Sequence, residues 1–143
     1  MTHGSLFSGI GGFDLAAEWA GWENKFHCEW NEFGQRVLNY YWPNATCYGD
    51  ITKTDFTIWR GRIDVLTGGF PCQDASLALQ TGGGQSGIEG DRTGLFFEML
   101  RAIQEIKPKY IVTENVENIL RTNDGRDFRT ILSELDGMGY NAE

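Results

Sequence analysis

The chain has 143 residues, with 12 Lys and Arg against 20 Asp and Glu, and its formal net charge is −8. This length suits one compact domain, and the 41% of hydrophobic residues is enough to build a core, which excludes wholesale disorder. The sequence has no run of about 18 apolar residues and no secretory signal at its start, so we expect a soluble intracellular protein without a membrane span.

Charge and cysteine content narrow the classes of protein further. An acidic chain is poorly suited to hold a nucleic-acid backbone by itself, because such affinity comes from Lys and Arg that displace counterions. The three cysteines, Cys28, Cys47 and Cys72, show neither Cys-x-x-Cys spacing nor the pattern of a disulfide framework or a zinc site. We therefore expect free thiols in a reducing compartment and no bound metal.

The first half of the chain alternates short apolar runs with helical patterns. A strand is predicted to end at 5–7 and to lead through a glycine turn into a helix over about 14–20. The next expected elements are a strand at 25–29, a helix at 32–41 and a short extended segment at 46–48.

The second half continues this alternation. Apolar runs and helical spacing predict two buried strands and two helices: strands at 63–67 and 110–113, and helices at 95–106 and 128–138, the latter ended by Gly139. Gln80–Gly94 is rich in glycine and is expected to be mobile. A new strand would start at Tyr140–Glu143, so we expect a truncated domain or one that a partner completes.

Strands that alternate with helices at this spacing predict right-handed crossovers. The expected fold is therefore α/β, with a doubly wound, mostly parallel sheet. Ligands of such sheets bind outside the carboxyl ends of the strands. The residues that follow each predicted strand are the first candidates for a site.

A glycine-rich turn, Phe7–Gly12, follows the first strand. Its glycines allow a tight turn and close approach of a ligand, and the helix N-terminus behind it favours negative charge. The spacing departs from the dinucleotide pattern Gly-x-Gly-x-x-Gly, because the third glycine follows the second directly and Asp14 stands at the expected position. Such turns also occur for packing alone.

Acidic and aromatic residues follow the next two strands. Glu29 falls where an acid commonly holds the ribose hydroxyls of a nucleoside-like cofactor, and Trp30 beside it offers a ring to stack on the base. Asp50 and Ile51 follow the third extended segment. Each residue alone is explained by a solvated acid or an ordinary core side chain, but three consecutive strand ends favour a cofactor site.

Two reactive groups follow the later strands. Cys72 comes directly after Pro71, which fixes the backbone, and a thiol there can attack as a thiolate if the site lowers its pKa. Glu114 ends the next apolar run, where partial burial would raise its pKa and let it donate a proton near neutrality. The alternatives are an inert structural cysteine and a helix-capping acid.

Four segments resemble, in order and spacing, the successive motifs of the DNA cytosine-5 methyltransferases: Leu6-Phe7-Ser8-Gly9-Ile10-Gly11-Gly12-Phe13, Gly69-Phe70-Pro71-Cys72-Gln73, Asp91-Arg92-Thr93-Gly94-Leu95-Phe96 and Glu114-Asn115-Val116. The resemblance covers nearly the whole chain. It implies a Rossmann-like methyltransferase fold, S-adenosylmethionine as cofactor with S-adenosylhomocysteine as product, and double-stranded DNA as substrate. It also implies a cytoplasmic enzyme, associated with the nucleoid if the host is prokaryotic.

The same resemblance implies a role for each matching residue. The implied cofactor-binding residues are Phe7, Gly9, Ile10, Gly12, Glu29, Trp30, Asp50, Ile51, Gly69, Pro71 and Leu95. Cys72 resembles the nucleophile that adds to C6 of a flipped-out cytosine, and Glu114 the acid at N3. Asn115 resembles a helper that orients Pro71, and Arg92 is a weaker candidate for holding the substrate.

The chain also departs from the family pattern. Ala75 stands where the family often has Phe, and residues 1–143 end before the Gln-x-Arg-x-Arg motif, the variable DNA-recognition domain and the late helix that completes the cofactor pocket. We therefore expect residues 1–143 to be an incomplete cofactor-binding and catalytic subdomain, poorly active without a C-terminal half or a second chain.

Two alternatives to this function stay open. One is a non-catalytic S-adenosylmethionine-binding or regulatory subunit. The other is a nicotinamide oxidoreductase, which would need the third glycine that Asp14 displaces.

Overall fold

The structure is a computed structural model that describes residues 1–71, 94–115 and 117–142. The chain divides into two compact units, which are described separately. The first contains Met1–Phe70 and Arg101–Glu114, and the second contains Pro71–Leu100 and Asn115–Glu143.

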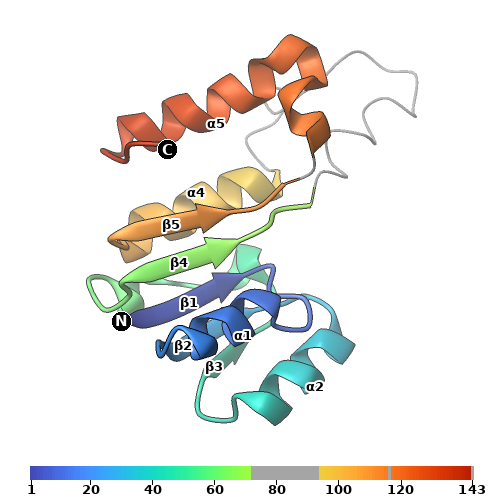
Figure 1. Cartoon of the computed structure of the whole chain (residues 1–143), viewed down its shortest axis with the longest axis vertical. Coiled ribbons are helices and arrows are strands. Elements are labelled where there is room, and N and C mark those ends of the chain that lie inside the picture. Colours follow the sequence, from blue (N-terminus) through green and yellow to red (C-terminus); the bar gives the residue numbers. More distant parts are fainter. Residues whose placement is uncertain (72–93, 116, 143) are drawn as a thin grey trace. The chain divides into compact units, whose positions relative to one another are not determined.

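The first unit is built on a parallel sheet of five strands (Figure 1). The strands are β1 (Thr2–Leu6), β2 (Glu23–Cys28), β3 (Thr46–Tyr48), β4 (Val65–Gly68) and β5 (Tyr110–Thr113). Their order is β3-β2-β1-β4-β5, and every neighbouring pair is parallel. The strand order therefore reverses beside β1, where doubly wound sheets bind ligands. This confirms the predicted α/β fold.

Short helices connect these strands. They are α1 (Gly12–Trp19), α2 (Glu32–Tyr41), the 3-10 turns η1 (Ile51–Lys53) and η2 (Thr57–Trp59), and α4 (Leu95–Ile106), which runs through both units. The side chain of Asn31 caps α2 by accepting hydrogen bonds from the N–H groups of Phe33 and Gly34. Among the described residues, no helix combines the length and apolar character needed to cross a bilayer.

Most predicted boundaries agree with these elements, with small shifts elsewhere. The bounds of α2, β3, α4 and β5 are as predicted, whereas α1 and β2 each begin two residues earlier and β4 begins two residues later. The expectation that 110–113 is buried was wrong, because Tyr110, Val112 and Thr113 are exposed. β5 lies at the edge of the sheet and has only β4 as a strand neighbour.

The core of the first unit is apolar and aromatic. Leu6, Phe26 and Leu66 are fully buried in the central strands. The Phe26 ring packs at 5.2 Å from the Trp59 ring and 5.6 Å from the Phe56 ring, measured between centroids. Burial of these large side chains is the main favourable term that holds the connections against the sheet.

The second unit contains the 3-10 turns η3 (Glu117–Leu120) and η4 (Thr122–Gly125) and the helix α5 (Arg126–Gly137). Gly139 ends α5 as predicted: its φ is 88°, and its N–H donates to the Asp136 carbonyl at 2.8 Å. Residues 140–142 form no strand, contrary to expectation, because the Tyr140 N–H instead closes the helix end on the Leu135 carbonyl.

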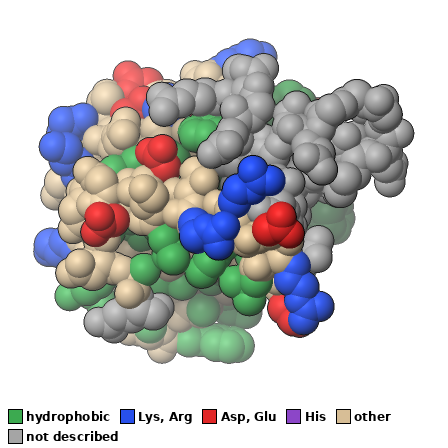
Figure 2. Space-filling view, turned by 90° about the horizontal axis from the view of Figure 1, so that it is seen from above, with side chains coloured by type: hydrophobic (Ala, Val, Ile, Leu, Met, Phe, Trp, Pro, Cys, Tyr) green, Lys and Arg blue, Asp and Glu red, His purple; other side chains and the backbone are tan. Residues whose placement is uncertain are grey.

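Charged side chains of both signs are mixed on the face seen in Figure 2. In the coloured part of that face, Lys and Arg lie among Asp and Glu. This agrees with the net charge of −8. Electrostatic binding to a phosphate backbone would need a denser set of cations.

Candidate functional site

One edge of the sheet carries a candidate residue after every strand. Phe7 follows β1, Glu29 follows β2, Asp50 lies two residues after β3, Gly69 follows β4 and Glu114 follows β5. Because all five strands are parallel, these residues share the carboxyl edge of one sheet (Figure 1). The predicted clustering at strand ends is therefore confirmed for this set.

The turn after β1 has an unusual backbone. Phe7, Gly9 and Gly11 have φ values of 53°, 58° and 91°, in the left-handed region that favours glycine. The Ser8 N–H donates to the Cys28 carbonyl at 3.1 Å, which ties the turn to the end of β2. Ile10 is 66% exposed, so the turn presents backbone and an apolar side chain at the surface.

Glu29 joins the turns that follow β1 and β2. Its Oε2 accepts the backbone N–H of Gly9 at 2.6 Å, and its Oε1 accepts the N–H of Asn31 at 2.8 Å. Gly34, in the first turn of α2, permits this approach, because a Cβ there would lie 2.6 Å from the Gly9 oxygen and 2.8 Å from Glu29 Cγ. Sequence reasoning missed Gly34, whose only signal was a glycine within a helical pattern.

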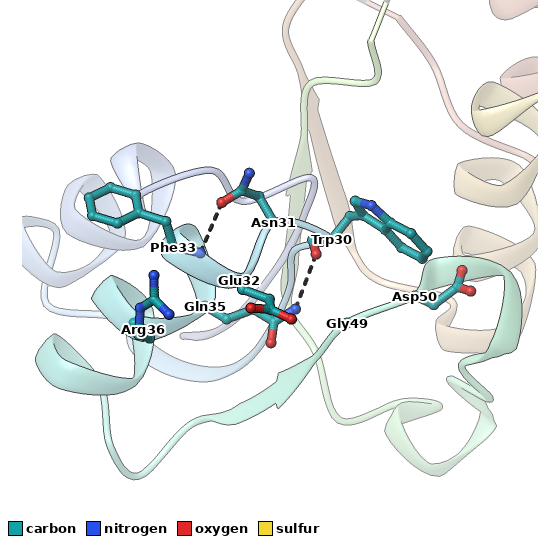
Figure 3. A pocket seen from close by; sticks show the side chains of 8 residues that line it. All are labelled: Trp30, Asn31, Glu32, Phe33, Gln35, Arg36, Gly49 and Asp50. Carbon is teal, nitrogen blue, oxygen red and sulfur yellow. Dashed lines mark hydrogen bonds between the residues drawn. The ribbon is translucent and has the colours of Figure 1, made fainter.

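An open pocket of about 650 Å³ lies beside this junction (Figure 3). Trp30, which is 73% exposed, and Asp50 lie toward one end, whereas Phe33 and Arg36 lie toward the other. The Gln35 side-chain amide donates to the Glu29 carbonyl at 2.8 Å and also to the Trp30 carbonyl. The volume is in the range of small-molecule sites.

Local hydrogen bonds stabilise the ionised form of the Asp50 side chain. The Thr52 hydroxyl and N–H donate to Asp50 Oδ1 at 2.7 Å and 3.0 Å, and Lys53 Nζ lies 3.2 Å from Oδ2. The Thr52 hydroxyl is the main cause that lowers the pKa of Asp50. Asp50 therefore remains a hydrogen-bond acceptor at neutral pH, next to the buried side chain of Ile51.

The ends of β4 and β5 also meet. The Glu114 N–H donates to the Gly68 carbonyl at 3.2 Å, and a Cβ on Gly69 would lie 2.5 Å from Glu114 Oε2. The Glu114 carboxyl group thus lies close to the Gly69 backbone, and a side chain at position 69 would displace it. The Glu114 side chain is exposed, so the expected partial burial was wrong, as for the edge strand that precedes it.

The remaining predicted site residues lie outside the described residues, in the second unit or at the start of α1. Cys72 and Arg92, and nearly all of the Gln80–Gly94 segment, lie outside the described residues. Pro71, Leu95 and Asn115 belong to the second unit, where Pro71 is exposed and the other two are half-buried. Gly12 is the first residue of α1 and is exposed.

A buried polar network behind the glycine turn was also missed by sequence reasoning. The Ser5 hydroxyl donates to the Asp14 carboxyl group, at 2.9 Å from Oδ1 and 3.0 Å from Oδ2, and lies 2.6 Å from Ser8 Oγ. Asp14 is completely buried, so the residue at the third-glycine position points into the protein.

The cysteines of the first unit have no catalytic setting. Cys28 is buried and Cys47 is half-buried, and both are free thiols, as predicted. Burial is the main cause that raises the pKa of Cys28 to about 12 and that raises the pKa of Cys47. Neither is a reactive thiolate near neutral pH.

Comparison with known proteins gives a family. The family model described as C-5 cytosine-specific DNA methylase matches residues 1–143. The Type II methyltransferase M.PspPI of Psychrobacter sp. (strain TA137) is 41% identical over 136 residues, and M.Eco47II of Escherichia coli is 39% identical over 136 residues. Each alignment covers 94% of this chain and 32% of the relative. The chain thus spans about a third of the length of these relatives.

Solved structures agree on the fold. A candidate DNA modification methyltransferase encoded within an E. coli prophage superposes with a TM-score of 0.72 at 24% identity, covering 96% of this chain and 38% of that chain. The S. pombe Dnmt2 methyltransferase gives a TM-score of 0.65 at 20% identity, covering 93% and 40%.

Proposed function

This chain belongs to the C-5 cytosine-specific DNA methylase family, and we propose that it binds S-adenosylmethionine and supplies the side chains that methylate C5 of cytosine in double-stranded DNA. The family predicted from the sequence motifs is confirmed. Because the chain spans about a third of its relatives, we propose that DNA selection depends largely on residues outside it, in a C-terminal half or a second chain. The net charge of −8 supports this division, because affinity for a phosphate backbone comes from Lys and Arg.

The observation that carries the cofactor proposal is the bond between Glu29 and Gly9, which joins the glycine turn to an acid beside an exposed tryptophan. Each Glu29 oxygen accepts one backbone N–H and keeps capacity for a ribose hydroxyl. Trp30 has a free ring face to stack on adenine, and Asp50 has acceptor oxygens for its amino group. These donors and acceptors fit an adenosyl group.

Other predicted residues would complete the cofactor pocket. These are Phe7, Gly9, Ile10 and Gly12 around the glycine turn, and Ile51, Gly69, Pro71 and Leu95 elsewhere. The bound cofactor supplies an electrophilic methyl group on a sulfonium sulfur. The protein itself must make cytosine C5 nucleophilic enough to accept that group.

We assign this role to Cys72 and Glu114. The Cys72 thiolate adds to C6 of a flipped-out cytosine while Glu114 donates a proton to N3, so that electron density moves to C5. After methylation, loss of the C5 proton to solvent, return of the N3 proton to Glu114 and elimination of the Cys72 thiolate restore the aromatic ring. Asn115 orients the Pro71 segment, and Arg92 helps to hold the base. The contact of Gly69 with Glu114 supports this assignment, since Gly69 lies three residues before Cys72.

The test is a covalent trap on DNA that contains 5-fluorocytosine, with S-adenosylmethionine present. Fluorine at C5 prevents the final elimination, so an active thiolate leaves a stable adduct that denaturing gels detect. Cys72→Ala abolishes the adduct and Glu114→Gln slows its formation, whereas the matched control Cys47→Ala leaves it intact.

Other outcomes of this experiment overturn the assignment. Cofactor binding without an adduct, even after addition of the C-terminal part of a relative, identifies a binding or regulatory module. Preferential binding of NAD in a parallel titration would revive the nicotinamide oxidoreductase, which the family match does not favour.

A further inference from the structure

The backbone of Phe7 is held in a conformation that only glycine adopts readily. Its φ of 53° lies in the left-handed region, which disfavours a residue with a Cβ by roughly 5- to 30-fold in population. Phe7 is not at a chain end but between the buried residues Leu6 and Ser8. Neighbouring interactions must therefore maintain this conformation.

Hydrogen bonds fix the chain on both sides of Phe7. Before it, the Ser5 hydroxyl donates to the Asp14 carboxyl group at 2.9 and 3.0 Å. After it, Ser8 Oγ lies 2.6 Å from Ser5 Oγ and 3.3 Å from both the N and O atoms of Cys28. The two serines that flank Leu6 and Phe7 are thus linked to each other and to β2.

Asp14 is the centre of this network. Its side chain is completely buried, and a buried carboxyl group is unfavourable unless it has hydrogen-bond partners. His27 Nδ1 lies 3.7 Å from Asp14 Oδ1, and neither ring nitrogen of His27 has a hydrogen-bond partner within the described residues. The partner that holds the Asp14 carboxyl group is therefore the Ser5 hydroxyl. Asp14 comes from the first turn of α1, so the network joins β1, the glycine turn and α1.

We propose that Asp14 is a positioning residue that acts through Ser5 and Ser8 to keep Phe7 in the left-handed conformation. The network thereby sets the shape of the turn that presents Gly9 to Glu29. The consequence for cofactor affinity rests on the proposed function, whereas the effect on the Phe7 backbone does not.

The test compares Asp14→Asn in two backgrounds, Phe7→Ala and Phe7→Gly. Both lack the aromatic ring, but only alanine is strained at positive φ, so the pair isolates the backbone conformation. In the Phe7→Ala background, we expect Asp14→Asn to raise the Kd for S-adenosylmethionine by up to roughly 5- to 30-fold. In the Phe7→Gly background, the same change raises it by less than about threefold. Calorimetric titration measures the Kd, and urea unfolding measures the midpoint in each variant.

Two further variants keep the test decisive. Ser8→Ala removes one hydroxyl without burying a new group, and it replaces Asp14→Asn if that variant does not fold. Asp64→Asn is the matched control, because the Asp64 carboxylate accepts the Thr2 N–H at the opposite end of β1. It should shift the unfolding midpoint equally in both backgrounds.

The outcomes separate the two proposals. If Asp14→Asn raises the Kd for S-adenosylmethionine by the same factor in both backgrounds, Asp14 only stabilises the fold. This result overturns the positioning role. If the unmutated chain fails to bind S-adenosylmethionine but Asp14→Asn shifts the urea unfolding midpoint by different amounts in the Phe7→Ala and Phe7→Gly backgrounds, the positioning role stands and the proposed function fails.

Discussion

The Glu29 carboxylate accepts the backbone N–H of Gly9 at 2.6 Å across the ends of β2 and β1. Through this bond, the acid that follows β2 becomes part of the glycine turn that follows β1. The second oxygen is also used, because it accepts the Asn31 N–H at 2.8 Å. Both oxygens must therefore be acceptors, which a carboxylate satisfies and an amide does not.

Glu29→Gln should weaken both the junction and cofactor binding. The amide NH₂ would face one of the two backbone N–H groups, so one hydrogen bond to a charged acceptor is lost, worth about 1.5–3 kcal/mol. We expect the Kd for S-adenosylmethionine to rise at least tenfold in a calorimetric titration. Glu32→Gln is the control, because it makes the same charge change at an exposed residue of the adjacent pocket. Equal effects of the two substitutions would refute a specific role of Glu29.

Gly34→Ala should be strongly unfavourable. The added Cβ would lie 2.6 Å from the Gly9 carbonyl oxygen, so the backbone of Gly9, whose N–H donates to Glu29, or that of α2 would have to shift. Overpacking of this kind costs about 1–3 kcal/mol of unfolding free energy. Urea unfolding checks the loss, and cofactor titration should show weaker binding. Gly137→Ala, in α5 with no atom within 4 Å of the new Cβ, should be neutral or slightly stabilising.

The sequence allowed the elements and the site edge to be predicted, but not the packing between them. The boundaries of α2 and α4 follow from local patterns, namely the apolar spacing of α4 and the Asn31 cap of α2. The roles of Gly34 and Asp14 depend on contacts with residues 5 to 25 positions earlier, which periodicity does not report. The exposure of Glu114 was mispredicted because an apolar run looks alike in central and edge strands.

Acid should destabilise the fold through His3. This side chain is buried, its Nδ1 lies 2.6 Å from Asn24 Oδ1, and burial is the main cause that lowers its pKa below the ordinary 6.5. The unfolded chain therefore binds a proton at His3 as the pH falls below 6.5, whereas the folded chain does not. The contribution of neutral His3 to the stability of the fold is thus present above pH 6.5 and is lost below it.

Urea unfolding between pH 7.5 and pH 5 tests this expectation. One group contributes at most about 1.4 kcal/mol per pH unit. The unfolding free energy should depend less steeply on pH in His3→Gln than in the unmutated chain. An unchanged dependence in that variant would assign it to another group.

Asp64 should give a second loss of stability at lower pH. Its Oδ1 lies 2.6 Å from Lys109 Nζ, and this hydrogen bond is the main cause that lowers the pKa of Asp64 from 3.8 to about 2. A lowered carboxyl pKa stabilises the fold above the unfolded value, so the contribution is lost as pH falls from 3.8 toward 2. Unfolding midpoints over this range should fall less in Asp64→Asn than in the unmutated chain. Lys109→Gln should also reduce the fall of the unfolding midpoint. If all three proteins showed the same fall, the hydrogen bond between Asp64 and Lys109 would not be its cause.

Cys28 should be inert toward thiol reagents in the folded chain. Only 2% of this residue is exposed, its Sγ lies 3.7 Å from the Gly49 carbonyl oxygen, and its pKa is about 12, so almost no thiolate forms at pH 8. Iodoacetamide labelling at pH 8, mapped by mass spectrometry in a Cys72→Ala background, should modify half-buried Cys47 well before Cys28. In urea both cysteines should react at similar rates, because unfolding removes the burial that raises both pKa values. Rapid labelling of Cys28 without denaturant would show that the carboxyl end of β2 opens readily, and the junction of Glu29 with Gly9 would then not be a stable part of the site.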